Sequence, residues 1–154
     1  MYGGFTVNIE KSERAKELFK NGYNCSQSVL GVWAKELGLD FNTAMKISQS
    51  FGGGMGRLRE VCGACSGAFM VLGMKYGTDN SKDFEAKKFL YEKVQQFAAR
   101  FKEQNNFDSI ICRDMLGLTG ASNSVPAGRT KEYYKKRPCI ELVGMAAGLL
   151  DEFI

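Results

Sequence analysis

The chain contains no histidine, and this absence removes several kinds of chemistry from consideration. Without an imidazole there can be no Ser–His or Cys–His nucleophile pair and no histidine ligand to a metal ion. Any metal site would have to use thiolates or carboxylates as its ligands. Charge does not single out a partner either, because the net charge of +4 is modest.

Long apolar runs are also missing. No segment offers the roughly 18 uninterrupted apolar residues of a membrane-spanning helix. The first eight residues, MYGGFTVN, lack the basic start and apolar stretch of a secretory signal. We therefore expect a soluble cytoplasmic protein without membrane insertion. Its five cysteines are then not expected to form permanent structural disulfides, because cytosolic thiols are kept reduced. They are buried small residues, ligands of a metal or cluster, or a redox system.

Length and composition predict one globular domain that spans residues 1–154. The chain is long enough for one substantial core, and its 44% apolar and 25% charged residues are typical of proteins that fold on their own. A basic run covers residues 129–137. We interpret it as a solvated face or loop rather than a nucleic-acid site, because no nucleic-acid motif accompanies it.

Helical periodicity extends over almost the whole chain, and no strand-like alternation competes with it. The pattern predicts an all-α fold, a single-domain bundle of about six to seven helices. Expected N-terminal caps are Asn24, Asp40 or Asn42, Asn80 or Ser81, and Asp108. The approximate helix ranges are 10–20, 24–38, 40–51, 61–76, 80–104, 108–116 and 138–153.

Three of these helices carry more specific expectations. The helix at 61–76 is apolar on most sides and should be central. In the longest helix, Phe84, Phe89, Phe97 and Phe101 should form an apolar stripe that packs on the core. In the last helix, small residues including Gly144 should leave room for a close neighbour.

The most informative segment is FGGGMGRLREVCGACSG, residues 51–67, in which a glycine-rich loop leads to two cysteines at a predicted helix start. The positive end of a helix and a nearby arginine both stabilise a thiolate. Cys25 and Cys139 are also expected near helix N-termini, whereas Cys112 is expected within a short helix. This placement favours reactive or ligating cysteines over purely structural ones.

Several motifs together carry a resemblance to a known family. They are GYNCSQ at 22–27, GGGMGR at 52–57, CGAxxG at 62–67, and the single later cysteines Cys112 and Cys139. This order and spacing resemble the C-GCAxxG-C-C family, whose proposed role is redox chemistry. The resemblance implies a small prokaryotic protein, common in anaerobes, with four family cysteines, here Cys25, Cys62, Cys112 and Cys139. Cys65 stands at a variable position of the pattern.

The first functional hypothesis is dithiol–disulfide or electron-transfer chemistry. Cys62 would be the attacking thiolate of low pKa, helped by the helix N-terminus and by Arg57 or Arg59. Glu60 would relay a proton or be an ordinary surface carboxylate. The resolving thiol would belong to one of three cysteines: Cys25, Cys139 or Cys65.

The partners of such chemistry would be a redox partner protein or a small-molecule electron donor. No nucleic-acid partner is expected, and a homo-oligomer is compatible with the sequence. The spacing Cys62-Gly-Ala-Cys65 resembles a thioredoxin-type pair, but the βαβ pattern that surrounds such pairs is missing.

Two alternatives come from other classes of function. In the second hypothesis, an iron–sulfur cluster or a zinc ion is held by Cys25, Cys62, Cys112 and Cys139. Against it, only Cys62 and Cys65 have the local spacing usual for such ligands.

In the third hypothesis, the loop at 52–57 binds an anion or nucleotide through the amides of Gly53, Gly54 and Gly56 and the side chain of Arg57. The loop lacks the Walker lysine and a preceding strand. We favour the simpler interpretation that these glycines let the backbone pack tightly around Cys62.

Overall fold

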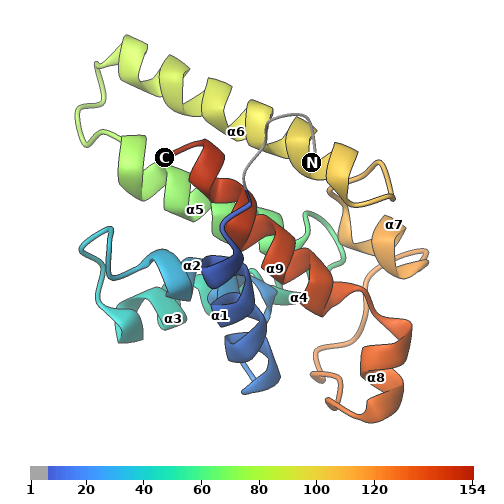
Figure 1. Cartoon of the computed structure of the whole chain (residues 1–154). Helices are drawn as coiled ribbons and strands as arrows, with labels where there is room; N and C mark the ends of the chain where they lie inside the picture. The colour runs from blue at the N-terminus through green and yellow to red at the C-terminus, as the bar shows by residue number, and fades with distance from the viewer. Residues whose placement is uncertain (1–6) are drawn as a thin grey trace.

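The computed structural model describes residues 7–154, and this part of the chain is built from α-helices with one short 3-10 turn (Figure 1). It contains no β-strand, and only an isolated antiparallel bridge joins Val61 to Ile111. The predicted all-α fold is confirmed. The elements are α1 (Ile9–Lys20), α2 (Cys25–Trp33), α3 (Phe41–Gln49), α4 (Gly52–Met55), α5 (Gly63–Tyr76), α6 (Phe84–Gln104), α7 (Cys112–Leu116), α8 (Lys131–Lys136), α9 (Cys139–Leu149) and the 3-10 turn η1 (Leu150–Glu152).

Two sequence expectations concern membranes and export. Among the described residues, no helix combines the length and apolar character needed to cross a membrane. The expectation that the chain starts without a secretory signal rests mainly on residues 1–6, which lie outside the described residues.

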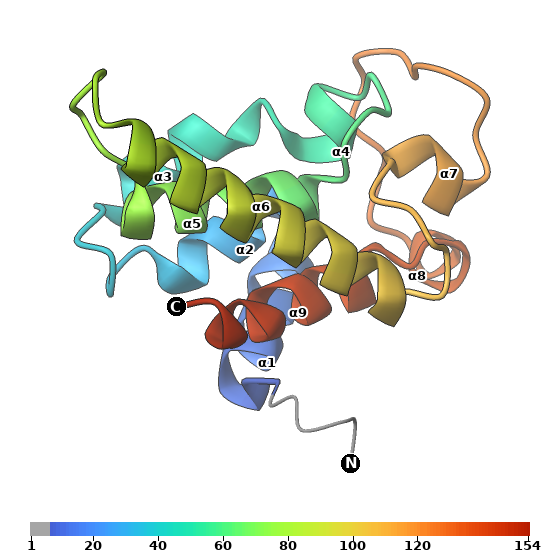
Figure 2. The same ribbon diagram turned by 90° about the horizontal axis from the view of Figure 1, so that it is seen from above.

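Helices α5 and α9 form the centre of the bundle, and for α5 this confirms the expectation from its apolar sequence. Helix α1 packs along α9, and α2 contacts α1, α5 and α9. Helix α6 lies across α5 and α9, while α7 and α8 lie together at one end of the molecule in both views (Figures 1 and 2). One hydrophobic core runs through residues from α1 to η1.

The close approach of α1 to α9 depends on the small residues of α9. A Cβ atom added at Gly144 would lie 2.8 Å from Ser12 Oγ and 2.5 Å from Lys16 Cε. At Gly148 it would lie 3.1 Å from the carbonyl oxygen of Asn8. The expectation that these glycines leave room for a neighbour is confirmed, and the neighbour is α1.

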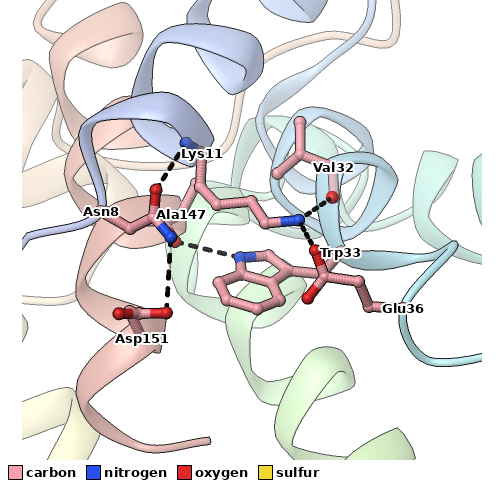
Figure 3. Close-up of polar contacts among 7 residues, drawn as sticks. All are labelled: Asn8, Lys11, Val32, Trp33, Glu36, Ala147 and Asp151. Atoms are coloured by element: carbon pink, nitrogen blue, oxygen red, sulfur yellow. Dashed lines mark hydrogen bonds and ion pairs between the residues drawn. The ribbon is translucent and has the colours of Figure 1, made fainter.

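A polar cluster joins α1, α2 and α9 near the close approach of α1 to α9 (Figure 3). The buried Lys11 donates from Nζ to the carbonyl oxygen of Val32 at 3.0 Å, and it also pairs with Glu36. Its ammonium group lies 4.5 Å from the centre of the Trp33 ring. Trp33 in turn donates from Nε1 to the carbonyl oxygen of Ala147 at 3.0 Å. Buried polar groups of three helices are thereby satisfied.

The helix caps follow the sequence in part. Asn24 caps α2 through a reciprocal capping box with Gln27, and Asp40 caps α3, as predicted. Helix α6 is capped by Asp83 rather than by Asn80 or Ser81. The expected cap at Asp108 is wrong. That residue has a left-handed φ of 50°, and α7 begins only at Cys112.

The predicted apolar stripe on α6 is correct only for its C-terminal half. Phe97 and Phe101 are fully buried, and Phe97 contacts the ring of Phe153 beyond α9. Phe84 and Phe89 remain 73% and 44% exposed. The core residues that cover the C-terminal half do not extend over the first turns of α6.

Candidate functional site

Each of the four family cysteines stands where a helix begins. Cys25, Cys112 and Cys139 are the first residues of α2, α7 and α9, and Cys62 is the N-cap of α5. The expectation for Cys112 is corrected, because it begins its helix instead of lying within it. Helix starts carry outward-pointing N–H groups and a partial positive charge, which favour thiolates.

These four cysteines line one cavity of about 500 Å³. The cavity wall also includes the glycine-rich loop, parts of α7 and the segment before α9. Cys65 is not among the lining residues. It is fully buried in the hydrophobic core, and all five cysteines are free thiols. The structure therefore brings together the four cysteines of the pattern and separates the fifth from them.

The glycines of the CGAxxG segment allow α2 to approach α5 at the cavity. A Cβ atom added at Gly63 would lie 2.9 Å from the Cβ of Cys25. At Gly67 it would lie 2.7 Å from the carbonyl oxygen of Ser26. Since real Cβ atoms do not approach so closely, larger residues would push Cys25 away from Cys62.

The glycine-rich loop has a similar packing role on the other side. Gly54 has a left-handed φ of 70°, and an added Cβ would lie 2.6 Å from the Cβ of Cys112. The amides of Arg59 and Glu60 donate to the carbonyl oxygens of Gly53 and Gly54. The amides of Gly56 and Arg57 likewise bond to Gly52. These internal hydrogen bonds support the interpretation that the loop glycines permit close packing.

The bridge between Val61 and Ile111 holds together the two backbone segments that carry Cys62 and Cys112. The amide of Cys62 donates to the carbonyl oxygen of Ile110 at 2.7 Å, and the amide of Cys112 donates to that of Glu60 at 2.6 Å. This pairing holds the start of α5 beside the start of α7. The Glu60 side chain is exposed and pairs with Arg113 at 3.0 Å, so it is a surface carboxylate.

Four arginines line the cavity, and its lining contains no aspartate or glutamate. Arg59 is 2% exposed and donates from Nη1 to Cys112 Sγ at 3.5 Å. Two more arginines, Arg129 and Arg137, come from the basic run at 129–137. The interpretation of that run as a solvated face or loop is therefore wrong for these residues, although its lysines are exposed. Arg137 directly precedes Pro138-Cys139, and this adjacency to a family cysteine could have indicated that Arg137 lines the cavity.

A family model described as "Putative redox-active protein (C_GCAxxG_C_C)" matches residues 23–153, nearly the whole chain. The chain belongs to the C_GCAxxG_C_C family. The resemblance carried by the sequence motifs is thereby confirmed. Neither the curated proteins nor the solved structures gave a match.

Of the four cysteines that match the C_GCAxxG_C_C pattern, Cys25 and Cys139 form a directly interacting pair. A hydrogen bond from the Cys25 thiol is the main cause that lowers the pKa of Cys139 to about 7. The Tyr133 hydroxyl, which also bonds to Cys139, lowers this pKa further, as do the charges of Arg137 and Arg59. The same hydrogen bond and burial raise the pKa of Cys25. At pH 7 about one half of Cys139 is therefore thiolate, whereas Cys25 stays a thiol.

The other two cavity cysteines are protonated at neutral pH. Burial raises the pKa of Cys62 to about 12, and it also raises the pKa of Cys112 despite the neighbouring Arg59. The expectation that Cys62 is the thiolate of low pKa is wrong, because burial outweighs the backbone hydrogen bonds at the start of α5. Burial likewise raises the pKa of Cys65.

A zinc ion or an iron–sulfur cluster held by the four cysteines would require their side chains to surround one centre. Among residues 7–154, no three cysteine, aspartate or glutamate side chains are grouped closely enough to hold one metal ion. Sharing a cavity is a looser condition than the tetrahedral geometry of a thiolate metal site. The arrangement of these side chains does not fit a site for a single zinc ion.

Proposed function

We propose that this protein is a thiol–disulfide oxidoreductase in which Cys139 attacks and Cys25 resolves. The observation that carries the proposal is the interacting pair of Cys25 and Cys139 in a cavity, with a Cys139 pKa of about 7. A thiol whose pKa is near the ambient pH is the most effective nucleophile in disulfide exchange, because it combines a large thiolate fraction with high intrinsic nucleophilicity.

In the first step, the Cys139 thiolate attacks one sulfur of a substrate disulfide R–S–S–R′. A Cys139–S–S–R bond forms, the S–S bond of the substrate breaks, and R′–S⁻ leaves. In the second step, Cys25 loses its proton and attacks Cys139 Sγ, which releases R–S⁻. The two cysteines are oxidised to one disulfide, and the substrate is reduced by two electrons to two thiols.

The electrostatics of the pair support this order of events. The hydrogen bond to Cys139 and the negative charge of Cys139 are two of the causes that raise the pKa of Cys25. Both disappear when Cys139 enters the mixed disulfide. The pKa of Cys25 then falls at the stage where a second thiolate is needed, and its proton can go to the departing R′–S⁻.

We assign Cys62 and Cys112 to a second dithiol in the same cavity. Their protonated state makes them slow in the first attack, but they line the wall beside the reacting pair. Thiol–disulfide exchange would let them receive the Cys25–Cys139 disulfide and become oxidised in turn. That exchange returns Cys25 and Cys139 to thiols, and a second substrate disulfide would oxidise them again, so that two substrate disulfides oxidise four thiols in two pairs.

Trapping experiments test the proposal. Reduced protein is mixed with one equivalent of 2-hydroxyethyl disulfide, quenched in acid and mapped by mass spectrometry without reduction. We expect a Cys25–Cys139 disulfide in the native protein and a stable mixed disulfide on Cys139 in Cys25→Ala. Cys139→Ala should react far more slowly, whereas the control Cys65→Ala should behave like the native protein. Mixed disulfides mainly on Cys62 or Cys112 in Cys25→Ala would contradict the proposal.

A further inference from the structure

The charge of the cavity indicates which disulfides fit it. Four guanidinium groups line it, and no carboxylate does. Since Cys62 and Cys112 are protonated at neutral pH and Cys25 is a thiol, Cys139 is the main thiolate available to balance them. The cavity therefore keeps a positive charge even when its nucleophile is ionised.

Two of the four arginines already have structural partners. Arg129 donates from Nη2 to the carbonyl oxygen of Tyr23 at 2.9 Å and from Nη1 to that of Phe19, and its guanidinium stacks 3.8 Å from the Phe19 ring. Arg57 donates from Nε to the carbonyl oxygen of Asn123 at 2.6 Å. These contacts attach the loops around the cavity to the rest of the fold.

The other two arginines, Arg59 and Arg137, are the two whose charges act on Cys139, and both retain unused donors. Arg59 bonds through Nε to Ser122 and through Nη1 to Cys112, but its Nη2 is buried and has no hydrogen-bond partner among the described residues. Arg137 contacts the Tyr133 ring at 5.1 Å, and no carboxylate of the described residues pairs with it. A buried guanidinium with a free donor costs free energy unless an anion compensates it.

We infer that the substrate is a small disulfide that carries a carboxylate, held by Arg59 and Arg137 beside Cys139. This inference rests on the proposed function. A cavity of about 500 Å³ has the size of a small-molecule site. Guanidinium groups bind carboxylates through charge-assisted, often bidentate hydrogen bonds. Because Arg59, Arg137 and Cys139 line the same cavity, an anion bound to the two arginines would share that cavity with the attacking sulfur.

The test compares three small disulfides that differ in charge. They are 3,3′-dithiodipropionate with two carboxylates, neutral 2-hydroxyethyl disulfide, and cystamine with two ammonium groups. The rate at which each oxidises the reduced protein is divided by its rate with a simple thiol in solution. We expect the anionic disulfide to exceed the neutral one by about tenfold or more at low ionic strength, which is the effect of one charge-assisted hydrogen bond.

Variants assign the preference to the two arginines. Arg137→Gln and Arg59→Gln should each reduce the ratio of anionic to neutral rates by about tenfold. The ratio is the readout because losing either arginine also raises the pKa of Cys139, which slows both reactions alike. Lys102→Gln removes an exposed charge from α6 and should leave the ratio unchanged. Arg137 is only half-buried, so its variant tests the inference even if Arg59→Gln does not fold.

The outcomes separate this inference from the function on which it rests. Equal normalised rates for all three disulfides, or an unchanged ratio in Arg137→Gln, would overturn the anionic substrate. A Cys25–Cys139 disulfide formed by the neutral reagent would still support the dithiol chemistry. If no reagent produced that disulfide, the proposed function itself would fail.

Discussion

Alkylation of the cysteines as a function of pH gives a direct measure of which thiol is the nucleophile. At pH 7, a pKa of about 7 makes about one half of Cys139 thiolate, whereas a pKa of about 12 leaves about 10⁻⁵ of Cys62 ionised. A thiolate of higher pKa is intrinsically more nucleophilic, and a difference of about 5 units offsets about two orders of magnitude. Cys139 should therefore react roughly two to three orders of magnitude faster than Cys62.

The assay is brief labelling of reduced protein with iodoacetamide between pH 5 and pH 9, with each cysteine quantified by peptide mass spectrometry. Access does not explain the expected difference, because Cys139 and Cys62 are 8% and 5% exposed. The labelling of Cys139 should rise with a midpoint of about pH 7. In Cys25→Ala, which removes the main cause of the low pKa, this midpoint should move toward the ordinary value of 9.0.

Tyr133→Phe should move the midpoint in the same direction, because it removes the second hydrogen bond to Cys139. Cys112→Ala is the matched control, since Cys112 is not among the causes of the shift, and its midpoint should stay near that of the native protein. Faster labelling of Cys62 than of Cys139 at pH 7 would refute the reasoning. A Cys139 midpoint near pH 9 in the native protein would do so as well.

Three further predictions concern packing, a buried charge and metal content. Gly54→Ala should lower the free energy of unfolding by at least about 2 kcal/mol in urea titrations, because Gly54 has a left-handed φ and an added Cβ would collide with Cys112. The control Gly73→Ala should be neutral or stabilising, because an added Cβ at Gly73 meets open space. Lys11→Met should cost about 1–3 kcal/mol because it leaves the Val32 carbonyl oxygen without its donor, whereas Lys35→Met on the exposed surface should change little. Protein purified without oxygen should contain neither stoichiometric zinc nor matching iron and sulfide, as measured by elemental analysis and visible absorption. If the protein instead contained stoichiometric metal, and Cys112→Ala lost that metal, the result would support the thiolate metal site.

The local structure could be predicted from the sequence because local chemistry decides it. Asn24 and Asp40 are strong N-caps, and the apolar sequence of residues 61–76 produces a central helix. Where two or more capping residues stand close together, the sequence does not rank them, and Asp83 caps α6 in place of its neighbours. The short helix α8 was not predicted, because four of its six residues are charged and the side chains that pack on the core are two adjacent tyrosines.

The site was less predictable, because it depends on contacts between distant segments. The pattern identified four cysteines, and their common cavity is a property of the tertiary structure. The helix start at Cys62 suggested a low pKa, but the degree of burial there could not be read from the sequence. Tyr133 and Arg137 were missed because they lie in a basic run whose sequence is typical of a solvated face, whereas both side chains line the cavity with Cys139.

The contacts of Cys139 also couple its reactivity to completion of the fold. Cys25, Tyr133 and Arg59, which lower its pKa, belong to separate segments that meet only in the native structure. In an unfolded chain at pH 7, a thiol with the ordinary pKa of 9.0 is only about 1% thiolate. A nascent or misfolded chain therefore carries five weakly reactive thiols and is poorly equipped to form incorrect disulfides. In the proposed mechanism, native packing itself activates the nucleophile.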